Sequence, residues 1–447
     1  MDSRRPSQRL VAWRRGALEV ATRDTGRPSR LPARQADVPA SLRDRCATLF
    51  REHRVNAFGG TFHVPNNESY PALFAWDSGY HALSLLNLDP DAAVEELTTL
   101  YRANRLPDGL LSHQRYVPGA EEHQHFIEDL FGPMFDGDRT PFVDPPTPAY
   151  AAARLSLALG APADQLLDEA VSQLRSLARH RTVGGRSLPV VLHPFETGTE
   201  GSALMRSLLP GGLGASLAVL KELTISCRSA GMAPDAALAA GHGFVVYDPT
   251  VCGWYLLALE EVATACAARG REAETEEAHA MAAAVARDVE ALLWWEEGQI
   301  FTAYDLTRSL QLQGVGAMGL LPAASRALME SGLSQRVAER HLRPDGPMWG
   351  PYGFAAGVIV PGGGVDRYVQ WDGNAVWGAT VYWAYLLAAR LGRWIEARRL
   401  RDQLTGLIDA HGFREFYDAL TGEPGGAGAA SGFSWPVLAL DMTIPPE

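Results

Sequence analysis

Amphipathic helical segments, repeated along most of the chain, constrain its fold more than any other feature of the sequence. From residue 149 onward, apolar residues recur at three- and four-residue spacing in segments rich in Ala and Leu. This spacing gathers apolar side chains on one face of a helix, and that face must pack against a neighbour. The segments expected to be helical are 149–159, 163–178, 212–229, 249–268, 272–294, 313–331, 333–341, 374–391, 394–410 and 433–440. Only short runs such as 189–192 and 357–360 resemble strands.

Three earlier segments, 41–50, 74–86 and 89–101, also read as helices, the last with a proline just inside its start. Between them and the later helices lies a long irregular stretch, 106–148, of the kind that usually serves a site. Helix pairs joined by alternately short and long loops indicate an all-α fold, a single toroid of helix pairs. No fixed-period repeat is present, which disfavours a simple solenoid. We expect a basic, weakly patterned N-terminal extension over 1–39 and one helical domain over 40–447.

The charge balance and the cysteines narrow the function classes. A formal net charge of -12 argues against nucleic acid and anionic membranes as partners, and favours a neutral or cationic small molecule. No stretch approaches the apolar length that spans a bilayer, and the Arg-rich N-terminus lacks the apolar run of a secretion signal. The four cysteines show no metal-ligand spacing and read as reduced core thiols. We expect a cytoplasmic protein whose oligomeric state, a homo-oligomer included, stays open.

Two carboxylates flank a glycine in the middle of the chain. Glu196 and Glu200 lie four residues apart on either side of Gly198, so they share a face in a helical turn or project from one rim in a loop. Far along the sequence, Glu415 lies between aromatic residues, where burial raises the pKa of a carboxyl group. Carboxylates held in unlike surroundings are what acid–base chemistry on a glycosidic bond requires. The alternative is that Glu196 and Glu200 are ordinary solvated loop acids.

Seven short motifs follow one another in a characteristic order. They are Trp76-Asp-Ser-Gly-Tyr-His81, Asp108-Gly-Leu-Leu-Ser-His113, Pro145-Pro-Thr-Pro-Ala149, His193-Pro-Phe-Glu-Thr-Gly-Thr-Glu200, Tyr247-Asp-Pro249, Trp371-Asp-Gly-Asn-Ala-Val-Trp377 and Gly412-Phe-Arg-Glu-Phe-Tyr-Asp418. In this order, over roughly 58–441, the sequence resembles the glycoside hydrolases of family 63 and their bacterial mannosylglycerate and glucosylglycerate hydrolase relatives.

The resemblance implies an (α/α)6 barrel that hydrolyses an α-glycosidic bond with inversion and without a cofactor. Glu200 matches the acid that protonates the leaving oxygen in that family, and Glu415 matches the base that activates water. Inversion requires the two carboxyl groups to lie about 6.5–9.5 Å apart, so that water fits behind the sugar.

Two departures from the family pattern bear on the substrate. Glu200 stands where the family has Asp, and this extends the acid by one methylene; a misplacement of about 1 Å can cost on the order of 100-fold in rate. Asp372 stands where the family has Arg, so an anionic aglycone such as glycerate loses a plausible partner. We therefore expect an α-linked small glycoside or glycosylated metabolite and leave its sugar open.

The residues expected to bind the sugar come from the same motifs. Each has a structural alternative: Asp77 is also a good helix cap, and the tryptophans are also core fillers. The HxH pair His123 and His125 lacks further ligands at known spacing, so no metal site is expected. The candidates for sugar binding are Trp76, Asp77, His81, Gln114, Glu196, Trp371, Asp372, Tyr417 and Trp435.

Two other functions remain open for the same barrel. A sugar epimerase of this architecture works through histidines on the barrel helices, and His81, His113 and His193 are its candidates. A catalytically altered, degenerate glycosidase binds a sugar without turning it over. The glycine-rich segment 422–428 soon after Glu415 is a candidate mobile lid.

Overall fold

Helices dominate the computed structural model, which describes residues 39–205, 208, 216–363, 365, 371–426 and 429–445. The longer helices are α1 (Ala40–His53), α2 (Ala75–Leu85), α3 (Pro90–Asn104), α4 (Glu121–Phe131), α5 (Thr147–Leu159), α6 (Asp164–His180), α8 (Leu217–Ser229), α10 (Pro249–Ala268), α11 (Glu272–Leu293), α15 (Gly378–Arg390) and α16 (Trp394–His411). Shorter ones are α9 (Pro234–Ala239), α12 (Leu320–Ala323), α13 (Arg326–Glu330) and α14 (Leu333–Val337). This content confirms the prediction of a helix-rich fold.

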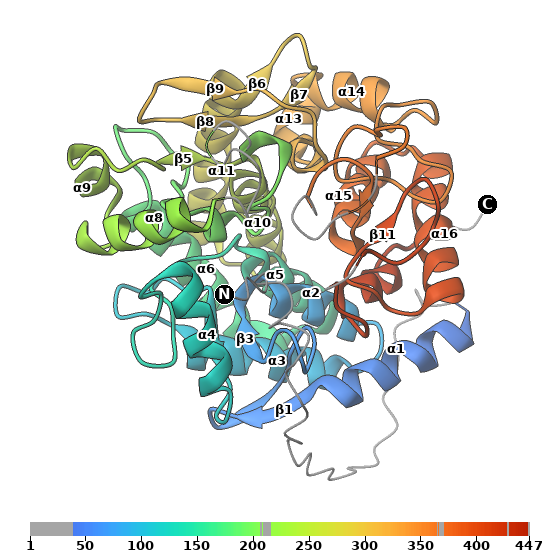
Figure 1. Cartoon of the computed structure of the whole chain (residues 1–447), viewed down its shortest axis with the longest axis horizontal. Helices are drawn as coiled ribbons and strands as arrows, with labels where there is room; N and C mark the ends of the chain where they lie inside the picture. The colour runs from blue at the N-terminus through green and yellow to red at the C-terminus, as the bar shows by residue number, and fades with distance from the viewer. Residues whose placement is uncertain are drawn as a thin grey trace, which may run out of the picture.

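Consecutive helices pack as pairs: α2 with α3, α5 with α6, α10 with α11, and α15 with α16. The first members of the pairs also contact one another, α2 with α5 and α5 with α10, and the short helix α12 contacts both α10 and α15. The 3-10 helix Trp435–Leu440, called η9, contacts both α15 and α2, so the contacts return to their start. In Figure 1 the chain runs around the molecule from blue to red, with α5 and α10 near the middle of the view and α1 and α16 at its edge.

Burial explains why the first helix of each pair lies inside. Every residue of α2 is buried, and so are nearly all residues of α10 and α15, which marks helices surrounded by protein. The outer helix α6 buries one stripe, including Leu167 and Leu174, and exposes the other face. Side-chain caps start two of these helices: Asp89 accepts from the Ala92 N–H in α3, and Asp248 accepts from the Thr250 and Val251 N–H groups in α10.

Helix α10 corrects the expectation that no stretch of the chain is long and apolar enough to span a bilayer. With 20 residues it is long and apolar enough to do so by length and composition. It lies, however, inside the protein, and most of its residues are buried there. Packing against α5, α11 and α12 therefore accounts for its apolar composition.

The strands form small antiparallel ladders in the loops. They are β1 (Arg54–Ala57) with β2 (Gly60–His63), β3 (Ala72–Phe74) with β4 (Gln114–Tyr116), β5 (Val246–Tyr247) with β8 (Ala303–Asp305) and β9 (Leu310–Leu312), β6 (Trp294–Trp295) with β7 (Ile300–Phe301), and β10 (Ala375–Val376) with β11 (Tyr417–Asp418). Two of these ladders position the site. The pairing of β3 with β4 sets Phe74 opposite Gln114, and β10 with β11 sets Val376 opposite Tyr417.

Several expected elements differ in the structure. The single helix expected over 313–331 is wrong: the segment forms a 3-10 turn and the short helices α12 and α13, since glycines and Pro322 interrupt it. The stretch expected to be irregular, 106–148, contains β4 and α4. Of the strand-like runs, 189–192 and 357–360, each contributes an isolated bridge, through Val191 and Gly357. Residues 1–38 of the expected N-terminal extension and the start of the expected helix 212–229 lie outside the described residues.

Candidate active site

The loop that carries the first candidate acid is anchored by a buried ion pair. Glu196 lies in a 3-10 turn (Pro194–Thr197), and both its carboxylate oxygens accept from the Arg181 guanidinium, at 2.7 and 3.0 Å. The N–H groups of Val143 and Leu192 donate to the same carboxylate, at 3.0 and 2.6 Å. Glu196 and Arg181 are almost fully buried. Glu196 therefore points into the protein and holds the loop, an arrangement that does not favour direct sugar contact.

Gly198 lets the loop turn back over an aromatic floor. Its φ of +66° lies in the left-handed region, which favours glycine. A Cβ atom at this position would lie 2.5 Å from Trp76 Cη2, so the backbone rests directly on the indole. The close approach fixes the loop relative to the start of α2 and determines where the next acid, Glu200, begins.

Glu200 and Glu415 lie within electrostatic range of each other. Burial raises the pKa of Glu200 from 4.5 to about 7, and the charge of Glu415 adds to the increase. Glu415 itself is buried, with Tyr70 Oη donating to Oε1 at 2.7 Å and the Ala430 N–H donating to Oε2 at 2.6 Å. Glu200 thus has a pKa near neutral pH, while two hydrogen-bond donors fix the position of the Glu415 carboxyl group.

Asp77 lies at the start of α2 and is bound by a tryptophan from the other end of the chain. The Trp435 indole N–H donates to Asp77 Oδ1, and both side chains are buried. Burial raises the pKa of Asp77 to about 7, against the hydrogen bond from Trp435, which lowers it. The helix α2 and the turn η9, which contact each other, position this pair.

Four tryptophans form the floor beneath the acids. Trp371 stacks on Trp377 with ring centroids 4.1 Å apart, and it lies 6.2 Å from Trp76 and 5.7 Å from Trp435. Trp76 and Trp435 meet edge to face at 4.8 Å. All four rings are buried, as the alternative role of filling the core would also require. They bring three of the predicted sugar-binding residues together beside Asp77.

Two predicted sugar-binding residues instead make contacts within the protein. His81 is buried behind Asp77, between the carboxylate of Glu96 and the hydroxyl of Ser434. The Tyr417 hydroxyl donates to the Gly412 carbonyl at 2.7 Å and accepts from the Arg414 N–H at 3.1 Å. Both residues have their polar atoms engaged in local structure, so the geometry favours supporting roles for them.

Gln114 and Asp372 are the remaining predicted sugar-binding residues. Gln114 is buried on β4, opposite Phe74, and its backbone contacts the hydroxyls of Ser112 and Thr140. Asp372 is buried, and its Oδ1 accepts from the Gly373 N–H at 2.7 Å. Residues 366–370, directly before this loop, lie outside the described residues, as do 427 and 428 of the expected lid.

Sequence reasoning missed a fourth carboxyl group at the site, Asp144. Its Oδ2 accepts from the Trp76 N–H at 3.0 Å, while Oδ1 is buried without a hydrogen bond and lies 3.7 Å from His113 Nε2. Burial raises the pKa of Asp144 well above its usual value, and the charges of Asp77 and Glu200 add to the increase. The only signal in the sequence was its position before the two prolines of the third motif.

Of the histidines proposed for an epimerase, His113 lies near Asp144, whereas His81 and His193 make contacts within the protein. Burial lowers the pKa of His193 to about 3; its Nδ1 accepts from the Phe195 N–H, and its Nε2 lies 3.2 Å from the Thr224 hydroxyl. With His81 engaged as well, these contacts give no support to the epimerase alternative.

Within the described ranges no group of three His, Cys, Asp or Glu residues is arranged to hold a metal ion. His123 instead contacts the Tyr116 hydroxyl.

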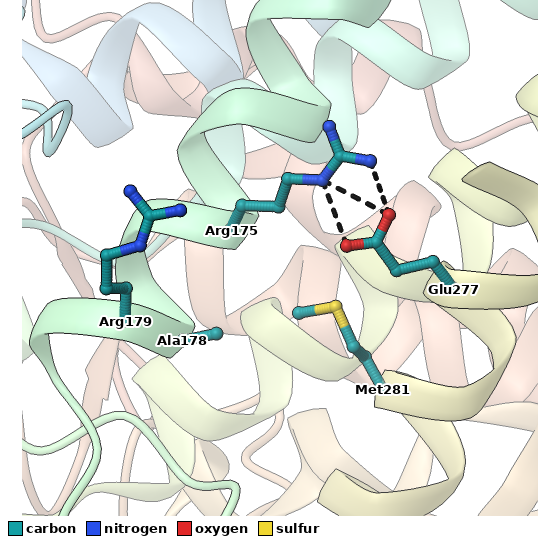
Figure 2. Close-up of a pocket in the computed structure, with 5 residues that line it drawn as sticks. All are labelled: Arg175, Ala178, Arg179, Glu277 and Met281. Atoms are coloured by element: carbon teal, nitrogen blue, oxygen red, sulfur yellow. Dashed lines mark hydrogen bonds and ion pairs between the residues drawn. The ribbon is translucent and has the colours of Figure 1, made fainter. Parts of the chain in front are cut away.

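A pocket elsewhere on the protein contains none of these residues. It lies between α6 and α11 and is lined by Arg175, Ala178, Arg179, Glu277 and Met281. Figure 2 shows Arg175 reaching across it to Glu277. Because both charged groups are well exposed, this ion pair contributes little to stability.

Comparison with known proteins identifies the family of the chain. Residues 70–436 match the family described as the mannosylglycerate hydrolase MGH1-like glycoside hydrolase domain. The chain belongs to this family. Curated mannosylglycerate hydrolases from Rubrobacter radiotolerans and from Thermus thermophilus are each 25% identical to it, over 86% of this chain and 93% and 97% of theirs.

A solved structure extends the family likeness to the fold. A family 63 mannosylglycerate hydrolase of Thermus thermophilus, in complex with glucose, superposes with a TM-score of 0.71. The match covers 90% of this chain and 99% of that one at 22% identity. As a member of the MGH1-like family, the protein is a glycoside hydrolase, and the family matches confirm the family 63 resemblance of the motifs.

Proposed function

We propose that this MGH1-like protein hydrolyses an α-glycosidic bond in a small glycoside with inversion, using Glu200 as general acid and Glu415 as general base. The observation that carries the proposal is the unlike environment of two neighbouring carboxyl groups. Burial raises the pKa of Glu200 to about 7, so that Glu200 keeps its proton up to near-neutral pH. Two hydrogen-bond donors hold the Glu415 carboxylate. Such a division between two acids is what inverting hydrolysis requires.

The two groups act in one step. The Glu200 O–H gives its proton to the glycosidic oxygen as the bond from that oxygen to the anomeric carbon breaks. The Glu415 carboxylate takes a proton from a water molecule, whose oxygen bonds to the opposite face of the same carbon. Tyr70 and the Ala430 N–H orient Glu415 for this role.

The sugar ring is proposed to lie on the tryptophan floor beside Asp77. There Trp76, Trp371 and Trp435 present an aromatic surface, and Asp77 and Asp144 offer carboxyl groups to the sugar hydroxyls.

The barrel architecture is part of this proposal. Helix pairs whose inner members contact one another in a cycle support an (α/α)6 barrel, with its site on the loops that enter the inner helices. Four buried, unpaired cysteines are compatible with a cytoplasmic location.

The related enzymes named above act on mannosylglycerate, and that compound is the first to test. By the motif resemblance, Asp372 stands where the family usually has Arg, so we expect weaker selection for an anionic aglycone than an Arg would give. We propose that a neutral or cationic aglycone is preferred, in keeping with the net charge of -12.

The experiment follows the product anomer by proton NMR during incubation with α-glucosides and α-mannosides, mannosylglycerate among them. We expect release of the β-anomer from at least one compound, and loss of about 100- to 10,000-fold in kcat when Glu415 is changed to Gln. The matched control is Glu423→Gln, an exposed acid in the same segment. Equal rates for wild type and Glu415→Gln on every substrate, or release of the α-anomer, would contradict the proposal.

A further inference from the structure

A chain of buried polar groups runs behind the sugar subsite and ends at Asp77. Its centre is Glu96 on α3, whose side chain is fully buried. Glu96 Oε2 accepts from both the backbone N–H and the Nδ1 of His63, at 2.9 and 2.8 Å. Glu96 Oε1 lies 3.3 Å from His81 Nδ1. One carboxylate thus ties β2, α2 and α3 together in the interior.

The chain continues from α2 to η9. His81 Nε2 lies 2.7 Å from the Ser434 hydroxyl, and the Ser434 N–H donates to the Pro65 carbonyl at 3.1 Å. Ser434 directly precedes Trp435, whose indole N–H donates to Asp77. Asp77 and His81 are four residues apart in α2 and so lie on one face of that helix. The contacts close a loop from Asp77 through α2 to His81, across to Ser434, and back through Trp435.

The charge on Glu96 fixes the direction of these hydrogen bonds. Burial raises the pKa of Glu96, but the hydrogen bonds from His63 and His81 outweigh it and hold the value at about 2, so Glu96 is an anion. Burial lowers the pKa of His81, which leaves its ring neutral. An anionic acceptor requires the His81 proton on Nδ1, and Nε2 must then accept from the Ser434 hydroxyl. The tautomer of His81 and the orientation of Ser434 both follow from Glu96.

We propose that Glu96 is a positioning residue of the sugar subsite: through His81 and Ser434 it holds the Trp435 indole on the Asp77 carboxylate. Glu96 does not touch the sugar. Its effect on the substrate passes through Asp77, so this inference rests on the function proposed above. Among the described residues, the carboxyl groups near Asp77 are those of Glu96 and Asp144, and the neutral groups against it are Trp76, Trp435 and Tyr80.

The first test reads the Trp435 indole directly. Nitrogen-15 NMR of the full-length protein resolves the indole N–H signals of its 11 tryptophans, and Trp435→Phe assigns the one at issue. Glu96→Gln keeps the shape of the side chain but no longer imposes the His81 tautomer, and Ser434→Ala removes the bridge. We expect both variants to move the Trp435 signal upfield as its hydrogen bond weakens. The control is Glu260→Gln, a buried acid on α10 paired with Arg390, which should leave the signal in place.

The second test measures substrate kinetics on whichever glycoside the panel above shows to be cleaved. Because Asp77 is proposed to bind the sugar in ground and transition states alike, Glu96→Gln should raise KM about tenfold, the loss of one good hydrogen bond, with kcat little changed. A general loss of structure would instead lower the melting temperature and the active fraction together. Glu260→Gln controls for that effect.

The outcomes separate this inference from the proposed function. If Glu96→Gln and Ser434→Ala leave both the Trp435 signal and KM unchanged, the positioning role is excluded and the hydrolase proposal stands. If no glycoside is cleaved but the Trp435 signal moves in both variants, the hydrolase proposal fails while the coupling from Glu96 to Trp435 is upheld.

Discussion

Replacing Glu200 with Gln should stabilise the protein in a pH-dependent way, because the wild-type carboxyl group is destabilising when ionised. Its pKa is 4.5 in an open environment and about 7 in the folded protein. Below the lower value both states hold the proton and there is no penalty. Between the two values the unfolded chain releases the proton and the folded protein keeps it, so stability falls as the pH rises. Above the higher value the penalty is constant.

The size of the effect follows from the two pKa values. Each pKa unit corresponds to about 1.4 kcal/mol, so the full penalty is about 3 kcal/mol. Glu200→Gln removes it, and the variant should be more stable than wild type by about 3 kcal/mol at about pH 8 and by less than about 1 kcal/mol at about pH 5. The same change removes the proposed proton donor, so the gain in stability should accompany a loss of activity.

Urea unfolding at the two pH values measures this difference. Glu276→Gln, at an exposed position on α11, is the matched control for replacing a carboxylate with an amide, and its effect should be the same at both pH values. Glu415→Gln removes the second cause of the raised pKa, so the pH-dependent gain from Glu200→Gln should shrink in that background. A gain that is equal at both pH values would refute the reasoning, since it would mean that Glu200 is not held protonated by its surroundings.

Two further predictions concern the loop that carries Glu200. Arg181→Met leaves the Glu196 carboxylate buried without its guanidinium, so the free energy of unfolding measured in urea should fall by about 3–5 kcal/mol. The double variant Arg181→Met with Glu196→Gln should recover part of that loss. An Arg181→Met variant as stable as wild type would contradict the pairing. Gly198→Ala places a Cβ 2.5 Å from the Trp76 ring at a residue with a φ of +66°, so the loop must shift. We expect kcat to fall about 100-fold, with a smaller change in the free energy of unfolding. An unchanged kcat would show that the position of this loop does not matter for catalysis.

The helical fold was largely accessible from the sequence because its signals are local. The expected helix 249–268 coincides with α10, and Asp89 with Pro90 predicted the start of α3. The expected helix over 313–331 failed where glycine and proline overrode a continuous apolar pattern. The small ladders were missed since strands of two to four residues carry no periodicity of their own.

The contacts that define the candidate site were not accessible in the same way. Asp77 is joined to Trp435 across 358 residues and Tyr70 to Glu415 across 345. Such pairs form where segments from opposite ends of the chain meet, and a single sequence does not show which distant segments come together. The motifs identified most of the residues through family resemblance, but their individual roles in this chain stay predictions.

Glu196 and Glu200 illustrate what decides the role of a carboxyl group. Sequence spacing treats them alike, as two acids on either side of a glycine. In the structure the Glu196 carboxylate accepts from a buried guanidinium and from two backbone N–H groups, and these contacts fix its position. Burial raises the pKa of Glu200 to about 7, and the charge of Glu415 adds to the increase. Hydrogen-bond donors therefore make Glu196 an acid that holds the loop in place, whereas burial makes Glu200 an acid that is able to give up a proton near neutral pH.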